Sequence, residues 1–94
     1  MLKIPDGVSV IRDSTFKRCA RLEKIFLPAN LVEIEQYAFG ECKSLTEIKI
    51  PANVSHVGKG VLKGCTRLEK IYYPACSGFE EKLSVGNDAA LIPY

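Results

Sequence analysis

Cysteine has the widest range of possible chemistry in this chain, because pairs of thiols form disulfides and groups of thiolates bind zinc. The 94-residue sequence has four cysteines, Cys19, Cys42, Cys65 and Cys76. The first three are each 23 residues apart, and the fourth follows after only 11. In a short chain, four cysteines favour a disulfide-linked secreted scaffold when their spacing looks like a set of loops. The equal spacing here indicates an internal repeat instead.

The prolines have the same period, at Pro5, Pro28, Pro51 and Pro74. Laid over one another, the segments 5–27, 28–50 and 51–73 share six apolar columns besides the cysteine. One repeat is too short to bury these positions in a closed core, so neighbouring repeats must stack. The sequence therefore predicts a repeat solenoid in a single domain that covers residues 1–94.

Each repeat divides into three short elements. The segments LEKIFLP, LTEIKIP and LEKIYYP have apolar residues at alternating positions before a proline, which predicts a short strand with one buried face. A turn follows, and then a second, shorter strand with the pattern apolar-x-x-apolar, as in Val8 to Ile11. The third element, Asp13 to Cys19 in the first repeat, is predicted to be one helical or 3₁₀ turn that directs Phe16 inward. The predicted coil therefore has strands on two sides and helical or 3₁₀ turns on the third.

Stacking decides between the possible roles of the cysteines. Equivalent residues in adjacent coils lie about 4.8 Å apart, but their side chains run parallel, which holds the Cβ atoms farther apart than the roughly 3.8 Å of a disulfide. Three rungs extend about 10 Å in a line, too far for one zinc ion. We therefore expect Cys19, Cys42 and Cys65 to be a buried column of free thiols, with no metal. Cys76 lies off the column and is expected to be more exposed.

Other chemical signals are weak. His56 is the only histidine and is predicted to face solvent, and Gly58, Gly60 and Gly64 do not have the spacing of a phosphate-binding loop. Asn53 begins an N-glycosylation sequon, but its place in the turn explains it. The net charge is +2 with signs alternating along the chain, and no apolar run approaches about 20 residues. We expect no enzyme activity, cofactor, nucleic-acid binding, membrane insertion or signal peptide in these residues.

The repeat resembles the BspA-like type of leucine-rich repeat. The stretches LTEIKIPANV and YAFGECKSL carry the pattern most clearly, and the three copies cover about three quarters of the chain. The resemblance implies an α/β-type leucine-rich-repeat superhelix whose strands form a short parallel concave β-sheet. Members are typically parts of bacterial and protist surface proteins that bind host proteins or other cells, which implies an extracellular or cell-surface location.

Both ends depart from the repeat. Met1 to Ile4 aligns with Lys24 to Leu27, so we expect either a piece of a longer surface protein or an uncapped N-terminal end that self-associates. Residues 74–94 are predicted to be a C-terminal cap, with a capping box at Ser77 and Glu80 that begins a short helix. The cap is expected to end in a last repeat-like strand.

The candidate site is the concave face. The residue between the last two apolar positions of each strand points away from the core, which gives the column Lys3, Phe26, Lys49, Tyr72 and Leu91 beside a second column of Lys24, Glu47 and Lys70. Exposed aromatic residues are enriched where proteins bind proteins. We therefore predict partner binding by Phe26, Lys49, Tyr72, Lys24, Glu47 and Lys70. The alternatives are that the aromatic rings only cover lysine stems, and that the chain is a structural spacer or stalk with no ligand.

Overall fold

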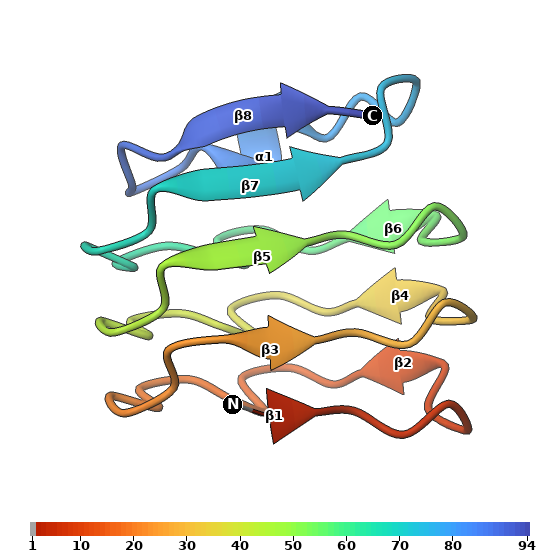
Figure 1. Ribbon diagram of the computed structural model, residues 1–94, viewed down its shortest axis with the longest axis horizontal. Helices are drawn as coiled ribbons and strands as arrows, with labels where there is room; N and C mark the ends of the chain where they lie inside the picture. Colours follow the sequence, from red (N-terminus) through yellow and green to blue (C-terminus); the bar gives the residue numbers. More distant parts are fainter. Residues whose placement is uncertain (1) are drawn as a thin grey trace.

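The computed structural model describes residues 2–94 and confirms a repeat solenoid (Figure 1). One side is a stack of five short parallel strands with the charged and aromatic positions of the repeat. These strands are β1 (Leu2–Lys3), β3 (Ile25–Phe26), β5 (Glu47–Lys49), β7 (Lys70–Tyr73) and β8 (Ala90–Pro93). Figure 1 shows them one above another from the N-terminus to the C-terminus. We call the solvent-facing side of these strands the strand face.

The predicted register is confirmed for the repeats. Leu2 pairs with Ile25, Lys24 with Glu47, and Ile48 with Ile71, each 23 residues apart. The last strand is different, because Leu91 pairs with Ile71 and Ile92 pairs with Tyr72. Our placement of Leu91 in the solvent-facing column was therefore wrong by one residue. A shift of one residue exchanges the two faces of a strand, and Leu91 packs against the core instead.

The second side of each coil also agrees with the sequence. Strands β2 (Val10–Ile11), β4 (Glu33–Ile34) and β6 (His56–Val57) form a parallel sheet with a 23-residue register. Figure 1 shows them behind the larger strands. Their inward-facing residues Ile11, Ile34 and Val57 are buried. Each coil is therefore closed by apolar residues from two opposing sides.

The third side is a column of turns closed by hydrogen bonds between residues i and i−3, as in Cys19 N–H to the Phe16 carbonyl at 3.1 Å. Two positions in each turn have a left-handed backbone. The first position is Ser14 (φ 58°), Tyr37 (φ 55°) and Gly60 (φ 64°), and the second is Arg18 (φ 63°), Glu41 (φ 56°) and Gly64 (φ 80°). This conformation is costly for residues other than glycine. It is held here by bonds to the next coil, such as Glu41 N–H to the Lys63 carbonyl at 2.6 Å.

The cap contains helix α1 (Glu80–Leu83), which Figure 1 shows behind β7 and β8. Our capping box was wrong, because Phe79 is the N-cap and no side chain caps the helix. Ser77 Oγ instead accepts a hydrogen bond from Phe79 N–H at 3.3 Å. Phe79 and Leu83 are both buried, so the short helix closes the end of the core with these two side chains.

Asn87 joins the cap to the repeats. The thiols of Cys42 and Cys65 donate to the carbonyls of Phe16 and Phe39 in the preceding coil, each at 3.1 Å. Asn87 Nδ2 makes the corresponding contact to the carbonyl of Leu62 at 3.4 Å. It also donates to the Leu83 carbonyl at 2.8 Å. Asn87 therefore continues the cysteine column after the repeat has ended.

Candidate binding face

The strand face is produced by the two-residue alternation of each strand. Ile25, Ile48 and Ile71 point into the core, while their neighbours Phe26 and Lys49 are exposed and Tyr72 is half-buried. The paired strands hold these neighbours in one line across the stack, because Lys49 lies opposite Tyr72 and the 23-residue register places Phe26 opposite Lys49. Phe26 is 51% exposed, which is unusual for a phenylalanine on a folded domain. Of the two aromatic residues predicted to face solvent, Phe26 is exposed and Tyr72 is partly exposed.

A groove of about 820 Å³ lies on this face. Five of the six predicted site residues line it, namely Lys24, Phe26, Glu47, Lys49 and Tyr72. The sixth, Lys70, is exposed on β7 opposite Glu47 but does not line the groove. The remaining lining is mainly apolar and includes Leu27, Ala29, Pro51 and Ala52. The volume is within the range of ordinary ligand sites, and the lining combines aromatic rings with a few charges.

Tyr94 is part of this groove and was missed at the sequence level. Its backbone N–H donates to the Tyr73 carbonyl at 2.9 Å, and its hydroxyl donates to the Ile50 carbonyl at 2.5 Å. The Lys49 ammonium lies over its ring, 4.9 Å from the centroid. Burial raises the pKa of the Tyr94 phenol. An aromatic residue directly after Pro93 could have indicated that Tyr94 belongs to the face. The one-residue error in the register of the last strand hid the direction of its side chain.

The comparisons with known proteins cover most of the chain. A family model described as BspA type leucine rich repeat region (6 copies) matches residues 1–83. The chain belongs to this BspA-type leucine-rich repeat family. Among solved structures, it is similar to a leucine-rich cell surface protein from Faecalibacterium prausnitzii A2-165, with 35% identity and a TM-score of 0.74. The match covers 77% of this chain and 19% of that one, and no curated protein matches.

In this BspA-type stack, the ion pairs are found away from the strand face. Among residues 2–94, the two pairs are Arg12 with Glu35 at 3.3 Å and Arg18 with Glu41 at 2.9 Å. Both connect equivalent positions, 23 residues apart, in the first two coils. The strand face instead has Lys3, Lys24, Lys49 and Lys70 with a single acidic residue, Glu47. Its lysines are therefore available to an outside anion.

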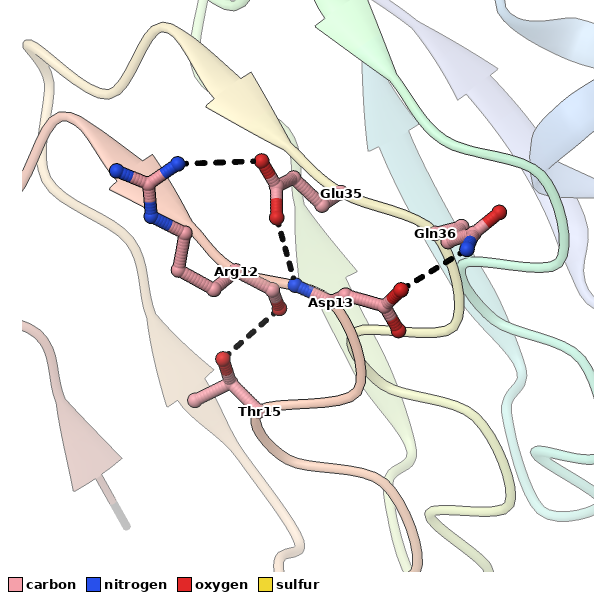
Figure 2. Close-up of polar contacts among 5 residues, drawn as sticks. All are labelled: Arg12, Asp13, Thr15, Glu35 and Gln36. Carbon is pink, nitrogen blue, oxygen red and sulfur yellow. Dashed lines mark hydrogen bonds and ion pairs between the residues drawn. The ribbon is translucent and has the colours of Figure 1, made fainter.

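Figure 2 shows the polar contacts between the first two coils. The Glu35 carboxylate accepts hydrogen bonds from the Arg12 guanidinium at 3.3 Å and from Asp13 N–H at 2.8 Å. Gln36 Nε2 donates to the Asp13 carboxylate at 2.9 Å. Hydrogen bonds from the hydroxyl of Ser14 and from Gln36 lower the pKa of Asp13. These contacts show that Asp13 and Glu35 connect the first two coils.

Two of the three cysteines predicted to form a buried column are buried, whereas the first is only partly so. Cys42 and Cys65 are fully buried, Cys19 in the first coil is half-buried, and Cys76 is exposed. The neighbouring thiol of Cys65, together with burial, raises the pKa of Cys42 far above its ordinary value. A thiol held neutral in this way is a poor nucleophile and a poor metal ligand. Across residues 2–94, no three potential metal-ligating side chains gather in one place.

Two further residues singled out in the sequence have exposed positions. His56 is exposed on β6, on the opposite side of the coil from the groove. Asn53 lies at the groove edge, where its side-chain nitrogen donates to the Ala29 carbonyl at 3.2 Å. The part of the chain that the structure describes has no helix long and apolar enough to cross a bilayer. The strand-face groove, with its aromatic and mainly apolar lining, is the candidate site.

Proposed function

We propose that this chain is a non-catalytic, adhesion-type module that presents its strand face to a protein partner. The observation that supports this most directly is the aromatic pair of exposed Phe26 and half-buried Tyr72 in the groove, where neither belongs to the buried core. Both stand on strands held by parallel pairing, so the surface is already rigid before a partner arrives. A preformed surface avoids part of the entropic cost of binding.

The proposed location is the outside of a cell. The similar structure from Faecalibacterium prausnitzii is described as a cell surface protein, and the family likeness supports the same setting. This chain corresponds to 19% of that protein, so we propose that it acts as one part of a larger surface protein. The partner in this account is a host protein or a protein on another cell.

The test is a comparison of three immobilised proteins against extracts of cell-surface proteins. The wild type is compared with the double variant Phe26→Ala/Tyr72→Ala and with Val32→Ala, which removes an exposed apolar side chain from another side of the coil. We expect a partner retained by the wild type and by Val32→Ala to be lost with the double variant. Far-UV circular dichroism checks that all three remain folded. Equal retention by the double variant would exclude the strand face.

The first coil supports a second proposal, that another coil covers its outer surface. Phe16, Cys19 and Leu22 are only partly buried, whereas their equivalents one coil later, Phe39, Cys42 and Leu45, are fully buried. Leu2 on β1 is 37% exposed. We propose that this surface associates end to end, either with another copy or with further repeats. Sedimentation of the wild type and of Leu2→Glu tests it, and an unchanged monomer in both would contradict self-association.

A structural spacer remains the alternative function. The hydrogen bonds that join each coil to the next, such as Arg18 N–H to the Gly40 carbonyl at 2.8 Å, make the stack a stiff element of fixed length. Failure of every extract to yield a partner sensitive to Phe26→Ala/Tyr72→Ala would favour this role. The aromatic groove is the reason that we prefer partner binding, since a spacer has no use for exposed aromatic residues.

A further inference from the structure

The strand face has a repeat of its own that is twice the spacing of the coils. Across β3, β5 and β7 one column reads Phe26, Lys49, Tyr72, so aromatic rings recur at every second coil. The neighbouring column reads Lys24, Glu47, Lys70, so ammonium groups recur at every second coil as well. Parallel strands are about 4.8 Å apart, so each of these periods is about 9.6 Å.

This distance matches one extended backbone conformation closely. A polyproline II helix rises about 3.1 Å per residue with three residues per turn, so residues i and i+3 lie on one side about 9.3 Å apart. A β-strand repeats each face after two residues, about 6.6 Å, and does not match. A polyproline II segment lying across the strands would therefore place every third residue on an aromatic ring. Proline-rich segments are known to bind aromatic-lined grooves because their conformation is fixed in advance.

The lysines of the strand face indicate which residues a bound segment would have between its prolines. Lys24 directly precedes β3 and Lys70 begins β7, so each lies two residues before an aromatic residue, at about 6.6 Å along the strand direction. The two ion pairs found among residues 2–94 are formed by arginines, and neither includes Lys24 or Lys70. An acidic residue next to each proline would point at these ammonium groups. Glu47 lies between the two lysines, so this column has two ammonium groups and one carboxylate, and its net charge favours an acidic segment.

We infer that the strand-face groove binds an acidic polyproline II segment with prolines at every third position. The prolines pack on Phe26 and Tyr72, and the carboxylates between them pair with Lys24 and Lys70. The ring of Tyr94, fixed by its bond to Ile50, forms one wall of the groove. This inference rests on the proposed partner-binding role and specifies the chemistry of the partner segment.

Four fluorescein-labelled peptides of twelve residues test the inference by fluorescence anisotropy. The probe contains four Pro-Glu-Glu triplets. The first control has Pro-Glu-Glu-Glu quartets, which change the proline spacing, and the second has Gly-Glu-Glu triplets, which keep the charge but lose the fixed conformation. The third has Pro-Lys-Lys triplets, which reverse the charge. We expect the probe to bind the wild type roughly tenfold or more tightly than any control.

Variants of the protein locate the site. Tyr72→Ala should weaken binding of the Pro-Glu-Glu probe by roughly tenfold, whereas Val32→Ala should leave it unchanged. High salt should also weaken binding, because exposed ion pairs are screened. Equal binding of a control peptide, no effect of Tyr72→Ala, or no binding at about 1 mM probe overturns the inference. If the probe fails while an extract partner is still lost with Phe26→Ala/Tyr72→Ala, the proposed function stands and only the peptide class is wrong.

Discussion

Gly58→Ala tests how closely the coils approach one another. A Cβ atom at Gly58 would lie 2.2 Å from the backbone nitrogen of Gln36 and 2.5 Å from its Cα. Real Cβ contacts are essentially never below 3.0 Å, so the second and third coils must separate by about 1 Å. The separation also weakens the bond from Gly58 N–H to the Ile34 carbonyl, which is 2.7 Å long.

The expected cost is the sum of these two effects. Overpacking against backbone costs about 1–3 kcal/mol, and a weakened hydrogen bond adds about 1 kcal/mol. We therefore expect Gly58→Ala to lower the free energy of unfolding by about 3 kcal/mol, a large part of the 5–15 kcal/mol typical of domains. In a chain of this size, that lowers the thermal midpoint by about 12–24 °C.

Denaturant unfolding followed by far-UV circular dichroism measures the change. Gly7→Ala is the matched control, because a Cβ there meets no atom within 4 Å. We expect this control to change the free energy of unfolding by less than about 1 kcal/mol. If the two variants differ by less than about 0.5 kcal/mol, the close contact between the coils does not exist and the stacking geometry is wrong.

Three further predictions concern the column, the cap and the pH dependence of stability. A thiol reagent should label exposed Cys76 before buried Cys42, and labelling of Cys42 first would contradict the column. Asn87→Ala should lower the free energy of unfolding by about 1–3 kcal/mol, because the carbonyls of Leu62 and Leu83 lose their donor; an unchanged denaturation midpoint would count against the cap. Burial and the nearby Glu80 carboxylate raise the pKa of Tyr73, so the fold favours the neutral phenol. That stability is complete below the unfolded pKa of about 10 and is lost as the pH rises through the folded value; Tyr73→Phe should reduce this alkaline loss, and identical alkaline curves would refute the assignment.

The repeat period was sufficient to predict most of the fold. A 23-residue period places equivalent residues in adjacent coils, and two-residue alternation then separates Ile48 in the core from Lys49 on the strand face. Both rules are geometric and depend little on which residues fill the positions. The solvent-facing positions of Phe26 and Tyr72 followed from the same rules.

The parts that the sequence did not predict lie where the period ends or where the backbone is unusual. In the last strand we placed Leu91 in the solvent-facing column, but Leu91 pairs with Ile71 and packs against the core, and Pro93 pairs with Tyr73. This shift is what brings Tyr94 into the groove.

The left-handed turns were also missed. Tyr37 and Glu41 have no propensity for positive φ, and they adopt it because the bonds between coils require it. The turns explain two glycines that sequence reasoning had left without a role. Gly60 and Gly64 occupy the left-handed positions of the third repeat, where glycine avoids the cost of a side chain.

Photocrosslinking tests most directly the central claim that the strand face is the surface that meets a partner. A benzophenone amino acid replaces Tyr72 in the groove or, as the control, His56 on the opposite side of the coil. Each protein is irradiated with extracts of cell-surface proteins, with and without an excess of unlabelled wild type. We predict an adduct from the groove position that the wild type competes away, and no such adduct from the control position. Competed adducts from the control position alone, or the same adducts from both, would contradict the account.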